Sequence, residues 1–390
     1  MGTLALGAAL TGMGAGRAAG SPPSLDDDPW RLKNFMERVA RASDIADPLE
    51  RCLRMPDPPG THWNRQGVEA YCRYHAMPSM TPARFQALIA KGQGAAVDKE
   101  FAGYLHAQMT DPANPGRLDR AMYAAGFHDA DPKTRAAIDA WKKQRPDSPF
   151  ALAASGIQYV AAAWAARGTA TAGHTTDAQW AGMHAMSDLA RIDLDRVAGM
   201  TPAVPPVYTA MYTLGLLNSD HEYAETALQH GFALQPGNVS LLLVQAGMTR
   251  EQWGGTRARQ EQLRREAAAL AASQPLAWVV VGTLSIYLDE GGACANSPGK
   301  PLAEIPEVAS ASAMACHAST GRMVGDDDAM ILAVEALRFD SGQTAALEIV
   351  GAMGRQHYAP WTKAALKRAV AENPGSSAVA DVTSTWLKEF

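Results

Sequence analysis

Prolines that stop apolar, alanine-rich segments restrict the fold of this chain more than any other feature. At four junctions a helical pattern ends at a proline and a new apolar segment begins at once. These junctions are Arg145–Pro146–Asp147–Ser148, Gln235–Pro236–Gly237–Asn238, Gln274–Pro275 and Asn373–Pro374–Gly375–Ser376. A proline just beyond a helix end stops the helix, and the Ser or Asn after it can cap the next one. The pattern therefore predicts antiparallel helix pairs joined by tight turns.

The composition indicates an all-α protein. The chain of 390 residues is 47% hydrophobic and 7% aromatic, and runs of β-branched residues with the period-two alternation of a strand are nearly absent. The prolines stand where tetratricopeptide-type arrays place theirs, although the junctions are unevenly spaced. We therefore expect a degenerate tetratricopeptide-like α-solenoid of stacked helix pairs, in which each pair buries its apolar face mainly against its neighbours in sequence.

The first residues have the composition of an export signal. Met1 to Ala19 contain no acid, a single base and an apolar run from Leu4 to Leu10, followed by small residues that lead into Ser21–Pro22–Pro23. This order is typical of a secretory h-region and cleavage region, although no Lys or Arg precedes Leu4. The alternative is a disordered Ala/Gly tail. After this segment no stretch reaches the ~18 apolar residues of a membrane span, so we expect a periplasmic or secreted protein, with a cytoplasmic one as the alternative.

The four cysteines form two pairs that are local in sequence. Cys52 pairs with Cys72 and Cys294 with Cys316, and an even count in local pairs is what an oxidising compartment permits. Loops of this size would contribute about 3 kcal/mol each by restricting the unfolded chain. The alternative is four buried thiols in a cytoplasmic protein. Neither pair has the CxxC spacing of a zinc or redox site, so we predict no metal site here.

These features divide the chain into four expected regions. The first is a signal peptide or disordered tail over residues 1–23. An N-terminal helical region with the Cys52/Cys72 pair covers 24–130, a central helical-repeat module covers 131–290, and a C-terminal helical region with the Cys294/Cys316 pair covers 291–390.

Short patterns that suggest chemistry have simpler explanations. Ser297 and Lys300 match the SxxK spacing, but Pro298–Gly299 between them prevents the helix that this chemistry needs. Asp131 in the cluster His128–Asp129–Ala130–Asp131–Pro132 precedes a helix, as do Asp326–Asp328, and carboxylates at such positions act as caps. We predict no catalytic residue, cofactor or metal ligand. The net charge of -5 gives no basis for binding nucleic acid.

The central stretch contains a recognisable series of aromatic, proline and glycine positions. The series runs through Trp141, Pro146, Ser148–Pro149, Tyr159, Trp164–Arg167–Gly168, Ala233–Pro236 and Trp253–Gly254–Gly255. With these residues the chain resembles the bacterial domain of unknown function 4034 over roughly residues 133–287. The resemblance implies a helical, tetratricopeptide-like module without an assigned activity, and it carries over no catalytic residues.

Four residues of this stretch are candidates for contact with a partner. Trp164, Arg167, Trp180 and Trp253 could line a concave groove that holds a peptide or glycan, whereas the simpler reading is that the tryptophans fill gaps between alanine-rich helices. An extended groove suits recognition, so we expect a non-enzymatic interaction protein of the cell envelope that binds an unidentified protein or peptide. The alternative is an envelope hydrolase for a cell-wall polymer or peptide, with an acid/base pair assembled from distant helices.

Overall fold

The computed structural model describes residues 30–111, 115–250, 253–289, 302, 305–319 and 326–390, and every regular element in these ranges is a helix. The predicted all-α architecture of stacked helix pairs is therefore confirmed. The predicted signal segment lies outside the described residues.

The proline-terminated junctions form as predicted. Helix α7 (Pro132–Gln144) ends before Pro146, and the Ser148 hydroxyl accepts a hydrogen bond from the Ala151 N–H at 3.1 Å to start α8 (Pro149–Arg167). The same device separates α11 (His221–Leu234) from α12 (Val239–Met248), through Asn238, and α19 (Ala359–Glu372) from α20 (Ser377–Leu387), through Ser376. Each cap contributes about 1 kcal/mol by satisfying an N–H group that the helix leaves free.

Neighbouring helices form close antiparallel pairs in the middle of the chain. The longest pair is α8 with α9 (Asp177–Ala198), where Gly156 lets the two backbones approach: a Cβ atom at Gly156 would lie 2.6 Å from the Leu194 side chain. The next pairs are α10 (Pro205–Leu217) with α11, and α13 (Arg257–Ala271) with α14 (Trp278–Asp289).

A core of aromatic rings packs between the helices that precede α8. The rings come from Phe85 on α4 (Pro82–Ala90), Phe101 on α5 (Gly94–Thr110), Trp141 on α7 and Phe127 after α6 (Arg117–Ala124). The Phe85 ring centroid lies 5.0 Å from that of Phe127 and 5.5 Å from that of Trp141. This core is continuous with the apolar face of the α8–α9 pair.

The first three helices do not pack in series. Helices α1 (Arg31–Ser43), α2 (Pro48–Arg54) and α3 (Arg65–Ala76) share one core with α12 to α15 (Ala311–Ser319), α17 (Asp326–Phe339) and α18 (Thr344–His357). The expectation that helices pack mainly against their sequence neighbours fails for these three helices, for a physical reason. Residues 328–336 of α17 are all buried, and a helix buried on every side needs more cover than one partner provides.

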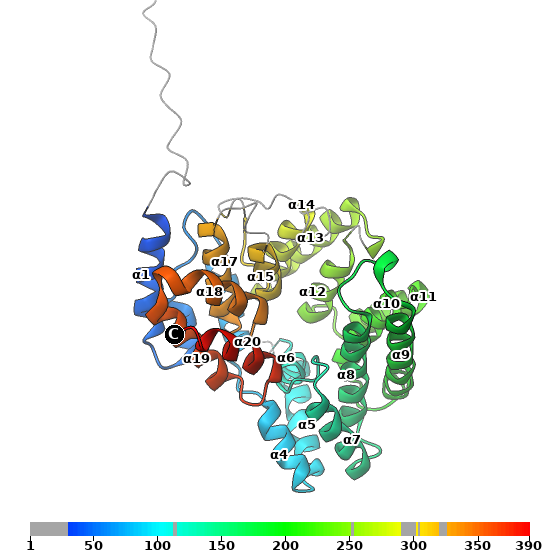
Figure 1. The fold of residues 1–390 in the computed structure, drawn as a ribbon. Coiled ribbons are helices and arrows are strands. Elements are labelled where there is room, and N and C mark those ends of the chain that lie inside the picture. The colour runs from blue at the N-terminus through cyan, green and yellow to red at the C-terminus, as the bar shows by residue number, and fades with distance from the viewer. Residues whose placement is uncertain (1–29, 112–114, 251–252, 290–301, 303–304, 320–325) are drawn as a thin grey trace, which may run out of the picture.

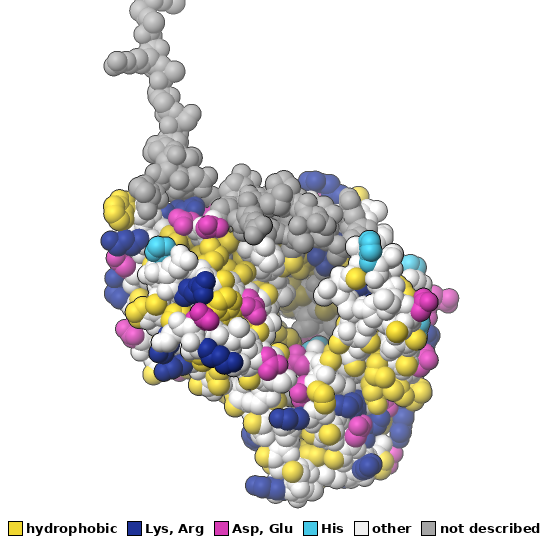
Figure 2. Space-filling model, in the orientation of Figure 1, with side chains coloured by type: hydrophobic (Ala, Val, Ile, Leu, Met, Phe, Trp, Pro, Cys, Tyr) yellow, Lys and Arg dark blue, Asp and Glu magenta, His cyan; other side chains and the backbone are white. Residues whose placement is uncertain are grey.

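The C-terminal helices also reach the α4–α7 group. The Ala83 N–H donates to the Pro374 carbonyl oxygen at 3.3 Å, and the Ser377 hydroxyl donates to the Asp131 carboxylate at 3.1 Å. The helices thus run around the molecule, with α17–α20 on one side and α8–α12 on the other (Figure 1). Figure 2 shows the surface hollowed between these two sides.

Candidate functional site

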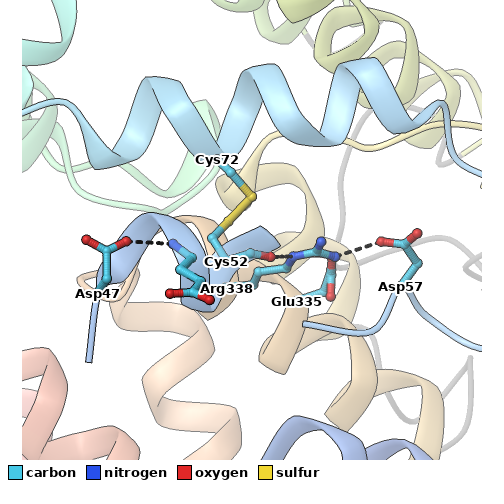
Figure 3. Close-up of a disulfide and its surroundings, with 7 residues drawn as sticks. Asp47, Cys52, Asp57, Cys72, Glu335 and Arg338 are labelled. Atoms are coloured by element: carbon cyan, nitrogen blue, oxygen red, sulfur yellow. Dashed lines mark hydrogen bonds and ion pairs between the residues drawn. A yellow bond between two sulfur atoms is a disulfide. The ribbon is translucent and has the colours of Figure 1, made fainter. Parts of the chain in front are cut away.

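A disulfide clamps the two short helices at the start of the chain. Cys52 on α2 and Cys72 on α3 are bonded with their Cα atoms 5.7 Å apart, as the sequence predicted (Figure 3). The Asp47 carboxylate accepts a hydrogen bond from the Glu50 N–H at 2.7 Å and caps α2 beside it. The second predicted pair cannot be described in the same way, because Cys294 lies outside the described residues.

Arg338 of α17 fastens this clamp to the C-terminal helices. Its Nε donates to the Cys52 carbonyl oxygen at 2.9 Å, and its Nη1 donates to Asp57 at 2.8 Å and to Glu335 at 2.6 Å (Figure 3). The Arg338 side chain is 2% exposed, and Glu335 is fully buried. Burial raises the pKa of Glu335 to about 7, although the Arg338 charge acts in the opposite direction.

A cavity of about 400 Å³ lies where the N-terminal and C-terminal helices meet, and we call it the seam cavity. One wall comes from α2, α3, α6 and the loop that follows α6, and includes both cysteines. The other comes from α17, the turn 340–343, α19 and α20. Segments from opposite ends of the sequence thus enclose one space.

The seam cavity contains nitrogen atoms without a partner. The Nε of Arg120 and the Nδ1 of His75 are buried and have no hydrogen-bond acceptor or donor opposite them in the described part of the chain. The Arg120 guanidinium lies 5.5 Å from the centre of the Tyr123 ring and forms no ion pair with a described residue. Burial, and secondarily the charge of Arg120, hold the pKa of His75 well below its usual value, so its imidazole is neutral at pH 7.

Carboxylates face the same space. The Tyr123 hydroxyl, on a side chain that is 47% exposed, donates to Asp340 at 3.2 Å, and the Gly342 N–H donates to the other oxygen of Asp340 at 3.1 Å. Asp129 lines the cavity, and its carboxylate makes no hydrogen bond or ion pair with the described residues. Partial burial, with the charges of Asp131 and Asp340, raises the pKa of Asp129 above its usual value.

The four residues predicted to contact a partner lie together, away from the seam cavity. The rings of Trp164 and Trp253 are perpendicular with centroids 5.3 Å apart, and the Arg167 guanidinium lies 5.4 Å from the Trp180 ring centre and 5.9 Å from that of Trp164. All four are partly buried. Arg167 also donates to the carbonyl oxygens of Gly168 and Ala170, so it ends α8 as well as joining the rings. Their role in binding stays a prediction.

Few features of the sequence indicate the seam cavity. Asp131, at the end of the His128–Asp131 cluster, caps α7 by accepting from the Thr134 N–H at 2.7 Å, as interpreted from the sequence. Asp129 of the same cluster faces the cavity instead, and Arg120, His75 and Asp340 belong to no motif. The detectable signal was Asp129, the acid of this cluster that the Asp131 cap leaves without a structural role.

A polar network elsewhere contains Ser, Asp and Lys, which are residue types found in catalytic sites, but its serine is fully buried. Ser155 of α8 donates to Asp193 of α9 at 2.5 Å, and Lys142 of α7 donates to Asp193 at 2.7 Å and to Ser155 at 3.3 Å. Ser155 is 0% exposed and does not line the seam cavity, so the network ties three helices together. Within the described ranges no three His, Cys, Asp or Glu side chains gather in a way that could hold a metal ion.

Comparison with known proteins confirms the family resemblance for part of the chain. Residues 83–221 match the family described as "Domain of unknown function (DUF4034)". The match begins and ends earlier than the stretch read from the sequence, so it contains Trp164, Arg167 and Trp180 but not Trp253. It also includes Arg120, Tyr123 and Asp129 of the seam cavity, whereas the opposite wall lies outside it. No curated protein and no solved structure matches the chain.

Proposed function

We propose that this chain is a non-enzymatic binding protein of the bacterial cell envelope that holds a protein or peptide partner on its hollowed side. The seam cavity serves as the anchoring point. The Cys52–Cys72 disulfide supports a compartment outside the cytoplasm, because such bonds persist in oxidising surroundings. Among the described helices, none has both the length and the apolarity to cross a bilayer.

One observation carries the proposal: buried nitrogen atoms without partners face a cavity that two distant parts of the chain enclose. Buried polar groups are almost always hydrogen-bonded, so Arg120 indicates a ligand that supplies an acceptor, and His75 indicates a polar group beside it. The surrounding helices are held by the disulfide and by the Arg338 contacts, so the site is preformed. A preformed site lowers the entropic cost of binding.

The proposal is tested by selecting peptides against the immobilised, disulfide-bonded protein from a displayed random library. Selected sequences are then synthesised both with free ends and with blocked ends, and both forms are titrated calorimetrically. We expect Arg120→Gln to weaken binding by about tenfold or more, since a charged hydrogen bond contributes roughly 1.5–3 kcal/mol. Arg65→Gln is the matched control, because the Arg65 side chain is 79% exposed and, among the described residues, pairs with Glu69 alone. Equal binding by the two variants contradicts the proposal, and so does the absence of any peptide ligand, whether displayed or free in solution.

The alternative function, an envelope hydrolase, is favoured by one observation. Asp129 has a raised pKa and shares the cavity with Asp340, and two carboxyl groups in different environments are the usual parts of acid/base hydrolysis. Release of soluble fragments from purified peptidoglycan or a protein substrate, abolished by Asp129→Asn, would favour the hydrolase. Under the binding proposal neither the native protein nor the variant releases fragments.

A further inference from the structure

The charges on the wall of the seam cavity divide into satisfied and unsatisfied groups. Arg51 pairs with Glu372, and Arg338 with Glu335 and Asp57. The remaining arginine from the C-terminal wall, Arg368, donates to the Ser43 carbonyl oxygen at 2.7 Å. Against this background Arg120 and Asp129 stand out, because neither side chain forms an ion pair or a hydrogen bond with a described residue.

These two unsatisfied charges have opposite sign and lie around one side chain. Tyr123 places its ring against the Arg120 guanidinium and its hydroxyl against Asp340, while the Asp129 charge acts on the same tyrosine. The two groups nevertheless do not pair with each other. Attraction between charges is stronger in a partly dehydrated site than in bulk water, so a ligand that carries both charges could pair with both groups.

We propose that the seam cavity binds a small zwitterion, a free amino acid or dipeptide, with its carboxylate on Arg120 and its ammonium group on Asp129 and Asp340. The inference rests on the proposed function and narrows its peptide partner to a ligand with both ends free. His75 Nδ1 adds a second polar contact beside Arg120. Met55, Val334 and Leu337 supply an apolar wall for a side chain.

The size of the cavity agrees with this class of ligand. A volume of about 400 Å³ is near the lower end of the range for small-molecule sites, which is roughly 300–1,000 Å³. Two extended residues span at most about 7 Å. This length suits a site whose two unpaired charges, on Arg120 and Asp129, both act on the Tyr123 side chain.

The test is a calorimetric titration of the full, disulfide-bonded chain with each proteinogenic amino acid and with Ala–Ala. The tightest ligand is then compared with its N-acetyl and C-terminal amide derivatives. We expect each derivative to bind at least about tenfold more weakly than the free ligand. The Arg120→Gln variant should bind the amide derivative as well as it binds the free ligand, because the contact to the carboxylate is already absent. For the same reason, the Asp129→Asn variant should bind the N-acetyl derivative as well as it binds the free ligand. Arg65→Gln and Asp147→Asn serve as controls, since the Asp147 side chain is 89% exposed.

The outcomes separate this inference from the function on which it rests. If no zwitterion binds but displayed peptides still bind through Arg120, the zwitterion assignment is wrong and the binding function stands. If the N-acetyl derivative binds as well as the free ligand, the site recognises an anion alone and the assignment is also wrong. If neither zwitterions nor displayed peptides bind, both proposals fail.

Discussion

The Nε of Arg338 donates a hydrogen bond of 2.9 Å to the carbonyl oxygen of Cys52, a residue 286 positions earlier in the chain. Through this contact α17 holds the helix that carries the disulfide, and α17 also forms part of the opposite wall of the seam cavity. The same guanidinium neutralises the buried Glu335. Arg338 therefore connects the closure of the fold with the shape of the candidate site.

Replacing Arg338 with methionine should destabilise the protein strongly. The substitution keeps much of the side-chain volume but leaves the buried Glu335 without its cation and the Cys52 carbonyl without its donor. Removing one partner of a buried ion pair costs about 3–5 kcal/mol, and this loss is measured by urea unfolding followed by circular dichroism. Adding Glu335→Gln should recover part of it. A loss below about 1 kcal/mol would show that the contact does not hold the seam together.

Removing the disulfide should also destabilise the protein, in this case through its effect on the unfolded chain. Cys52 and Cys72 are 20 positions apart, and a cross-link over such a loop contributes about 3 kcal/mol by restricting the unfolded state. The double variant Cys52→Ala/Cys72→Ala is compared with the native protein in urea, with and without dithiothreitol. Any further effect of the reductant on the double variant reports on Cys294 and Cys316. An unchanged unfolding midpoint would contradict the predicted role of the clamp.

The carboxyl group of Asp119 should make stability depend on pH. Burial raises its pKa from 3.8 to about 6, although Gln108 donates to it at 2.7 Å. The folded protein therefore holds the proton more tightly than the unfolded chain. This contribution is complete below about pH 4 and is lost as the pH rises to about 6. The free energy of unfolding should fall over this window by on the order of 2 kcal/mol more in the native protein than in Asp119→Asn. Parallel pH profiles would refute the assignment.

The contact between α8 and α9 can be tested with two glycines. Gly156→Ala puts a Cβ atom 2.6 Å from Leu194 and should cost about 1–3 kcal/mol, because the helices must move apart. Gly103 on α5 has no atom within 4 Å of a Cβ atom built on it. Gly103→Ala should therefore stabilise the protein by about 0.5–1 kcal/mol. Thermal unfolding of the two variants tests both expectations. A loss of stability in Gly103→Ala would contradict the open helix surface described at this position.

The parts of the fold that depend on neighbouring residues were predictable. Ser148, Asn238 and Ser376 start helices because a hydroxyl or amide oxygen lies next to free N–H groups three residues on, and that spacing is visible in the sequence. The Cys52–Cys72 bond was predictable for the same reason, since the two cysteines flank one proline-rich loop. The tryptophans were also identifiable, because they are rare in an alanine-rich chain.

The closure of the fold and the seam cavity could not be predicted in this way. Nothing near Cys52 indicates that its carbonyl will accept from Arg338, because that contact depends on the packing of the whole chain. Arg120 and Asp129 resemble ordinary surface residues in sequence, and only the C-terminal wall gives them a shared cavity. The periodicity of hydrophobic residues shows which face of each helix is apolar, but it does not determine which distant helix covers that face.

The most direct measurement is hydrogen–deuterium exchange on the protein with and without a peptide or zwitterion that binds it. If the ligand occupies the seam cavity, backbone amides of residues 72–82, 120–129 and 334–344 should gain protection together, because all three segments line it. Protection restricted to the segments around Trp164, Trp180 and Trp253, or to only one wall of the cavity, would contradict the central claim that opposite ends of the chain build one binding site.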